Sequence, residues 1–100
     1  MRLQLVKLGG NLIAPKNWPA HTADVKTIRR LGKEIREFGE SLIVGHGMGN
    51  FAHREASQYR TNEGFINQES KLGACVTQDV AARINRIVVD ELLKLGLPVG

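Results

Sequence analysis

An α/β fold, with a parallel sheet that carries helices on both faces, is predicted by three observations. Leu3 to Leu8 is a short apolar run that ends at two glycines, and residues 41–44 form a second run that ends at Gly45; both have the length of buried strands. Between them, apolar residues recur every three or four positions from Val25 to Phe38, the period of a helix. A helix that joins two strands makes them parallel, and parallel strands are normally covered on both faces.

The helix between the two strands has clear limits. Thr22 is predicted to cap its N-terminus, because a hydroxyl oxygen can accept a hydrogen bond from a free backbone N–H group. Gly39 is predicted to end it, because glycine readily adopts the left-handed conformation that closes helices. The chain therefore opens as a strand, a helix and a second strand.

The second half of the chain is predicted to hold one strong helix. Residues 50–59 have modest helical character, and residues 60–73 are polar without a clear period. Thr77 and Asp79 suit the N-terminus of the strong helix, and a Gly-Leu-Pro sequence suits its end. Residues 97–100 are predicted to lead into a third strand. The apolar stripe of the helix consists of Val80, Ile84, Ile87, Val88, Leu92 and Leu95.

The composition of the 100 residues is that of one globular domain. Hydrophobic residues make up 42% and charged residues 24%, which argues against disorder and against a disulfide scaffold. The single cysteine, Cys75, has no partner in the chain, so a reducing cytoplasmic location is predicted, with the thiol buried. No apolar run approaches the roughly 20 residues of a membrane span, and no secretory signal is evident, so no membrane partner is predicted.

Two glycine turns carry the candidate chemistry. In residues 7–11, glycines allow backbone N–H groups to approach an anion, and Lys7 adds a positive charge. Residues 45–50 form the second turn. Both turns follow the carboxyl ends of strands, where open α/β sheets bind ligands, and the net charge of +4 suits an anionic partner. Neighbouring turns of this kind are predicted to hold two phosphate groups of a small phosphorylated compound.

Other interpretations of these residues stay open. Each turn is also compatible with a simple strand-to-helix connection, since neither has the spacing of a Walker loop or of the G-x-G-x-x-G dinucleotide pattern. His53, four residues after Gly49, is predicted to donate a hydrogen bond to a bound phosphate, although a lone histidine is often only a surface or packed residue. His46 and His53 lack the spacing of a metal site, so no protein-bound metal is predicted.

A basic stripe lies along the first predicted helix. It is either a contact for nucleic acid or the solvated face opposite the apolar one. No aromatic side chains are interleaved to stack on bases, so the solvated face is preferred and no nucleic-acid partner is predicted. The stripe consists of Lys26, Arg29, Arg30 and Lys33.

Four segments of the sequence together resemble a known family. The first two are K-L-G-G-N-L-I, which begins at Lys7, and the single residue Lys16. The other two are H-G-M-G-N-F-A-H at residues 46–53 and I-N-R-I-V-V at residues 84–89, which a Gly-Leu-Pro sequence follows. This resembles the N-terminal part of isopentenyl phosphate kinase, a branch of the amino acid kinase superfamily, whose pattern reads K-L-G-G-S, a lysine, H-G-G-G-S-F-G-H and L-N-x-x-V-V. The resemblance implies the N-terminal portion of the amino acid kinase fold. It also implies ATP-dependent phosphorylation of isopentenyl phosphate to isopentenyl diphosphate.

The resemblance further implies roles for individual residues. Catalysis is implied for Lys16, which would stabilise the transferring phosphoryl group, and for Lys7 and His53. Mg²⁺ would arrive with ATP and not on protein ligands. The residues implied to bind ATP are Lys7, Leu8, Gly9, Gly10, Asn11 and Gly49. The residues implied to bind the acceptor are Gly47, Met48 and His53.

Several positions depart from the family pattern. Asn11 replaces the usual serine, Pro15 stands where an acidic residue is common, and Ala52 replaces a glycine. Met48 replaces the middle glycine of the second turn. It is predicted to narrow the phosphate cradle and to be strained if the backbone there needs a positive φ. This departure bears on the identity of the substrate more than on the fold.

Length is a further departure, because members of this superfamily are much longer. We therefore expect residues 1–100 to form a single partial domain on the acceptor-substrate side, without the nucleotide-binding half. A separate chain or a homodimer partner would complete it. Two alternatives are a non-catalytic phosphate-binding or assembly module, and a related kinase of another phosphate or phosphonate such as fosfomycin.

Overall fold

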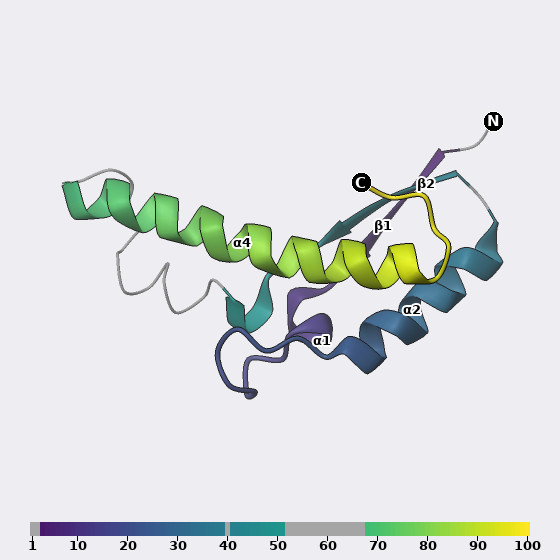
Figure 1. The fold of residues 1–100 in the computed structure, drawn as a ribbon, viewed down its shortest axis with the longest axis horizontal. Helices are drawn as coiled ribbons and strands as arrows, with labels where there is room; N and C mark the ends of the chain where they lie inside the picture. Colours follow the sequence, from purple (N-terminus) through teal and green to yellow (C-terminus); the bar gives the residue numbers. More distant parts are fainter. Residues whose placement is uncertain (1–2, 40, 52–67) are drawn as a thin grey trace.

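The chain folds around two parallel strands that a helix connects (Figure 1). The computed structural model describes residues 3–39, 41–51 and 68–100. The strands β1 (Leu3–Leu8) and β2 (Ser41–His46) pair in parallel, from Leu3 opposite Ser41 to Leu8 opposite His46. The predicted α/β fold with a parallel sheet is confirmed. The helices are α1 (Gly10–Ile13), α2 (Val25–Phe38), the 3-10 helix η1 (Gly49–Phe51) and α4 (Gln68–Lys94).

Helix α2 has the predicted length but a different N-terminal cap. The carboxylate of Asp24 accepts hydrogen bonds from the backbone N–H of Thr27 at 3.1 Å and from its hydroxyl at 2.8 Å. The prediction that Thr22 caps the helix is wrong. Thr22 lies too far before the first turn for its hydroxyl to reach the free N–H groups there. At the other end, Gly39 closes α2 with a φ of 71°, as predicted.

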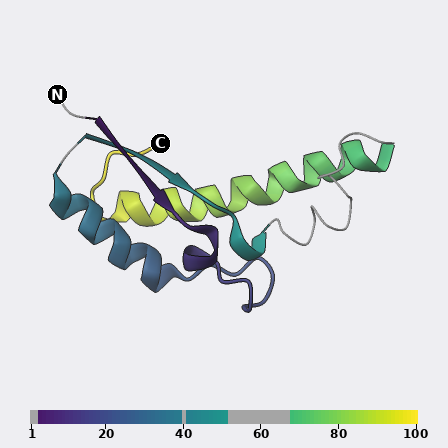
Figure 2. The same cartoon turned by 180° about the vertical axis from the view of Figure 1, so that it is seen from behind.

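Helices cover one face of the sheet. Seen from behind, the strands lie in front of α4 (Figure 2). Leu8 and Val44 lie on the covered face and pack in the core, whereas Leu3, Leu5 and Ile43 on the opposite face are 62%, 74% and 54% exposed. Helices on the second face stay a prediction. The buried core consists of Leu8, Ile13, Ala14, Ile28, Phe51, Ile84, Val88 and Leu92.

Helices α2 and α4 approach each other closely at Gly32. A Cβ atom on Gly32 would lie 2.6 Å from a methyl carbon of Leu95 and 2.8 Å from one of Leu92. Any larger residue would therefore push the helices apart or displace these leucines. The absence of a side chain at Gly32 allows α4 to pack against α2 over the sheet.

Helix α4 is longer than the sequence predicts. It begins at Gln68, although the expected N-terminal signals are Thr77 and Asp79. Residues 68–76 contain only two large apolar side chains, too few for a recognisable stripe, and this part of α4 extends beyond the strands (Figure 1). Cys75 is exposed there, so the prediction of a buried thiol is wrong. Within the described ranges, no helix has both the length and the apolar content needed to cross a bilayer.

Two shorter segments also bear on the predictions. Residues 97–100, which are predicted to lead into a third strand, have no regular secondary structure of their own, and Leu97 and Val99 pack, partly buried, against the core. Of the segment 50–59, Asn50 and Phe51 belong to η1, and the remaining residues lie outside the described ranges.

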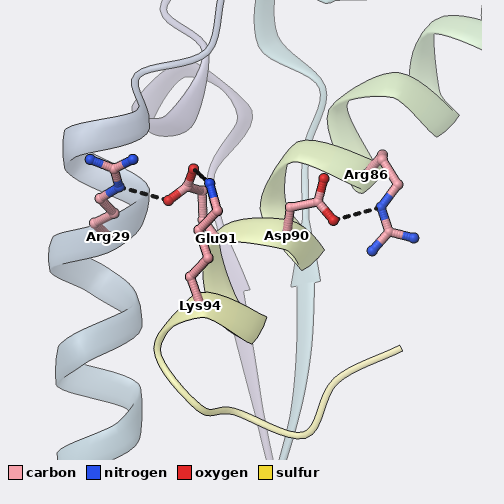
Figure 3. Close-up of polar contacts among 5 residues, drawn as sticks. All are labelled: Arg29, Arg86, Asp90, Glu91 and Lys94. Carbon is pink, nitrogen blue, oxygen red and sulfur yellow. Dashed lines mark hydrogen bonds and ion pairs between the residues drawn. The ribbon is translucent and has the colours of Figure 1, made fainter.

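A buried carboxylate links α2 to α4 (Figure 3). The Glu91 side chain, 8% exposed, accepts a hydrogen bond from Nε of Arg29 at 2.7 Å, and Nζ of Lys94 lies 3.4 Å from its other oxygen. The hydrogen bond from Arg29 holds the pKa of Glu91 below its usual range; the positive charges of Arg29 and Lys94 add to this, and burial opposes it. Arg30 pairs with Glu34 at 3.5 Å. Two members of the basic stripe are therefore paired with carboxylates of the same chain.

Acidification is expected to destabilise the fold through Glu91. Because its pKa is lower in the folded than in the unfolded state, its contribution to stability is complete above the unfolded pKa and is lost as the pH falls through the folded pKa. Urea denaturation between about pH 7 and about pH 3 measures this. The unfolding free energy of Glu91→Gln should decline less below about pH 4 than that of the natural chain.

The matched control for this experiment is the neighbouring carboxylate on α4. Asp90 is exposed and pairs with Arg86 at 3.0 Å (Figure 3), so Asp90→Asn should keep the acid-induced decline of the natural chain. An unchanged decline in Glu91→Gln would contradict the assignment.

Candidate functional site

The two glycine turns contact each other backbone to backbone. The strands end side by side, and the N–H of Gly47 donates to the carbonyl of Leu8 at 3.0 Å. A Cβ atom on Gly10 would lie 2.6 Å from the nitrogen of Gly49, and one on Gly47 would lie 2.7 Å from the nitrogen of Gly10. Real Cβ atoms do not approach this closely, so residues without a side chain are required at these positions. The two predicted turns thus form one site at the carboxyl edge of the sheet.

Gly49 has the most constrained backbone of the second turn. Its φ is 52°, and a Cβ atom there would overlap the carbonyl oxygens of Ala14 and Gly10. Met48 does not have a positive φ, so the strain predicted for it is absent. Its partly buried side chain packs against the core. The positive φ falls one residue later, on a glycine that tolerates it.

The first turn is open on its outer side. A Cβ atom on Gly9 would meet no other atom within 4 Å, and the side chains of Lys7 and Asn11 are exposed beside it. Leu8 is 4% exposed and belongs to the core, so only its backbone is available to a ligand. The turn can therefore admit an anion to its backbone next to a lysine.

Lys16 lies in the loop that joins α1 to α2, which we call the Lys16 loop (residues 15–22). The backbone N–H of Lys16 donates to Oδ1 of Asn11 at 2.8 Å, and its side chain is exposed. Asn11 thus connects the first glycine turn to the Lys16 loop. The family usually has a serine at this position, and the serine side chain is shorter than that of asparagine.

Asn50 connects the second glycine turn to the same loop. The residue is only 7% exposed. Its Nδ2 donates to the carbonyls of Pro15 and Thr22, both at 2.8 Å, and its Oδ1 accepts from the N–H of Thr22 at 3.0 Å. The backbone N–H of Asn50 also donates to the carbonyl of Ala14 at 3.0 Å. The sequence motifs predict no role for this residue, although Asn50 belongs to the second glycine turn and stands where the family pattern has a serine.

His46 connects the second turn to α4. Its Nε2 lies 3.0 Å from Nδ2 of Asn85, and its Nδ1 lies 2.8 Å from the carbonyl oxygen of Gly47. An amide nitrogen can only donate, so Nε2 accepts and Nδ1 carries the proton that it donates to Gly47. His46 therefore orients the turn. Within the described ranges, no three His, Cys, Asp or Glu side chains gather where they could hold a metal ion.

The structure brings together most of the predicted site residues. Those of both turns meet at the sheet edge, and Lys16 is tied to the first turn by Asn11. His53 lies outside the described residues. Asn50 and Asn85, for which the sequence predicts no role, form hydrogen bonds with residues far away in the sequence.

Comparisons with known proteins identify the family. The sequence profile of the amino acid kinase family matches residues 2–99. The isopentenyl phosphate kinase of Methanothermobacter thermautotrophicus is 32% identical over 99 residues, which cover 94% of this chain and 37% of that protein. The isopentenyl phosphate kinase of Methanocaldococcus jannaschii is 30% identical over 109 residues, which cover 96% of this chain and 41% of that protein.

Solved structures show the same fold. An X-ray structure of isopentenyl phosphate kinase matches with a TM-score of 0.87 and 31% identity, over 97% of this chain and 42% of the other. A substrate complex of isopentenyl phosphate kinase matches with a TM-score of 0.80 and 26% identity, over 96% and 40%. The chain spans about two fifths of the length of these relatives. The resemblance read from the motifs is confirmed, and the chain belongs to the amino acid kinase family.

Proposed function

We propose that this chain is part of a kinase that transfers a phosphoryl group from ATP to isopentenyl phosphate, which yields isopentenyl diphosphate. The observation that supports this most is the contact between two glycine turns at the carboxyl edge of β1 and β2, with Lys7 exposed at the same edge. Glycine turns bring backbone N–H groups to anions, and lysine adds positive charge. The relatives named above are isopentenyl phosphate kinases.

The first turn is assigned to ATP. The open space at Gly9 lets a phosphate approach the backbone, with Lys7 and Asn11 exposed beside it. Leu8 and Gly10 contribute backbone groups only. When bound, ATP supplies the phosphoryl group and brings Mg²⁺ with it. Lys7 neutralises negative charge at this turn, which is where phosphoryl transfer needs it.

The second turn is assigned to the acceptor phosphate. Gly47, Met48 and His53 are proposed to bind it. Gly49, the residue of this turn that contacts Gly10 of the first turn, is proposed to contact ATP. Lys16 is proposed to bind the phosphoryl group during transfer. An acceptor phosphate is already ionised near neutral pH, so these residues need to position it and offset its charge, and no strong base is required.

The proposal includes a nucleotide-binding half, supplied by a separate chain or by a homodimer partner. One alternative is a phosphate-binding or assembly module without catalysis. A phosphonate acceptor such as fosfomycin is a second alternative. It is favoured by Met48, which stands where the family has a glycine.

Isopentenyl phosphate is expected to bind the chain, and His53→Ala should weaken this binding about tenfold. That is the effect of removing one hydrogen bond to a charged group. Isothermal titration calorimetry measures both affinities. Lys26→Ala, which removes a cation from the exposed face of α2, is the control and should bind like the natural chain. Equal affinities of the natural chain and His53→Ala, or no binding by either, would remove His53 from this role.

Two further titrations separate the alternatives. A non-hydrolysable ATP analogue should raise the affinity for isopentenyl phosphate if both substrates share the site. An affinity that does not respond to the nucleotide favours the binding module. Stronger binding of fosfomycin than of isopentenyl phosphate favours a phosphonate acceptor.

A further inference from the structure

The Lys16 loop is held at both ends by a single side chain. The amide of Asn50 contacts the carbonyl of Pro15 at the start of the loop and both the N–H and the carbonyl of Thr22 at its end, over 2.8 to 3.0 Å. These partners are 35 and 28 positions away in the chain. Because Asn50 follows Gly49 directly, the same residue anchors the loop to the second glycine turn.

Further contacts hold the end of the loop against η1. The N–H of His21 lies 3.5 Å from the carbonyl oxygen of Asn50, and its ring lies 5.8 Å from the ring of Phe51. His21 has a φ of 61°, a conformation that residues other than glycine keep only where their surroundings enforce it. Together with the bond from Lys16 to Asn11, these contacts set the backbone path of the loop.

The side-chain N–H groups of Asn50 are not available to a ligand. An asparagine amide has two N–H groups, and both are used by the carbonyls of Pro15 and Thr22. The side chain is also buried. Any effect of Asn50 on phosphate chemistry must therefore pass through the loop that it holds.

We propose that Asn50 is a positioning residue, which fixes the Lys16 loop to the second glycine turn so that Lys16 stands at a set place relative to the acceptor phosphate. This inference rests on the proposed function for the role of Lys16. It adds that the loop and the second turn move as one unit. Loss of the Asn50 donors frees the loop while leaving the strands and helices in place.

The loop contains its own probes. Trp18, the single tryptophan of the chain, lies in it and is 38% exposed. The bond after Lys16 is a trypsin site, and its cleavage reports how readily the loop opens. Asn50→Asp keeps the shape and the acceptor but removes both donors, and its carboxylate would face two carbonyl oxygens. Asn17→Asp is the matched control, since it places the same charge on an exposed residue of the same loop.

The first measurement needs no ligand. Relative to the natural chain, Asn50→Asp should be cleaved after Lys16 about tenfold faster, and acrylamide should quench Trp18 more strongly, with the far-UV circular dichroism unchanged. Asn17→Asp should behave like the natural chain. Unchanged cleavage and quenching in a folded Asn50→Asp would overturn the proposal. If Asn50→Asp does not fold, Asn50→Ser, which keeps one donor and one acceptor, is measured in the same way with the same two outcomes.

The second measurement asks whether Asn50 acts through Lys16. Isopentenyl diphosphate carries both the acceptor phosphate and the transferred group, so its binding should weaken in Asn50→Asp and in Lys16→Ala. The double variant should bind no more weakly than Lys16→Ala, because the position of an absent side chain no longer matters. Additive losses would overturn the positioning role. Failure of the natural chain to bind any phosphate would contradict the proposed function, and the cleavage experiment would still decide whether Asn50 holds the loop.

Discussion

Gly49→Ala is expected to lower the unfolding free energy by about 2–5 kcal/mol. A left-handed backbone costs a residue with a Cβ atom about 1–2 kcal/mol, and forcing an atom into occupied space typically costs about 1–3 kcal/mol more. Both conditions hold at Gly49, where φ is 52° and the added carbon would overlap the carbonyls of Ala14 and Gly10. Urea denaturation followed by circular dichroism measures the loss.

Gly9→Ala is the matched control in the other turn. Gly9 has a φ of −60°, and an added Cβ atom would meet nothing within 4 Å. Its unfolding free energy should stay within about 0.5 kcal/mol of that of the natural chain. Similar losses in the two variants would show that the contact between the turns does not control stability.

Ile84→Ala is expected to destabilise the fold by about 2–5 kcal/mol, the usual range for truncation of a buried isoleucine. Ile84 is fully buried and lies in the core that α4 shares with α1, α2 and η1. For a chain of this size the loss corresponds to a fall in Tm of about 4–8 °C per kcal/mol. Thermal unfolding followed by circular dichroism measures it.

Leu93→Ala provides the control on the same helix. Leu93 is 46% exposed, so its truncation removes less buried surface and should change stability by less than about 1 kcal/mol. Equal shifts in Tm for the two variants would mean that α4 does not pack on the core through Ile84.

The elements that could be predicted are those that local patterns determine. β1 and α2 have the predicted limits because an apolar run and a helical period repeat over neighbouring residues. The sequence does not predict the start of α4, because its first turns extend beyond the strands (Figure 1) and carry no apolar stripe. The sequence does not decide between Thr22 and Asp24 as the cap of α2, because both residue types are good caps and the choice depends on where the loop enters the helix.

The candidate site could be predicted in part. The glycine turns follow directly from the strands, so their meeting at one edge could be predicted, whereas the contact of Gly10 with Gly49 depends on how the two strands pair. The sequence does not show which residue of the turn takes the positive φ, so it leaves open whether Met48 is strained; the structure places the positive φ on Gly49. The role of Asn50 depends on partners 28 and 35 positions away, and no sequence pattern records such bonds.

The contact between the two glycine turns also determines when the site forms during folding. It joins positions 10 and 49 and so closes a long loop that contains all of α2. Such contacts form slowly, because the chain must first overcome the entropy of closing the loop, whereas α2 is local and can form early. The proposed phosphate site therefore forms only after the two strands have paired, and a partly folded chain lacks it.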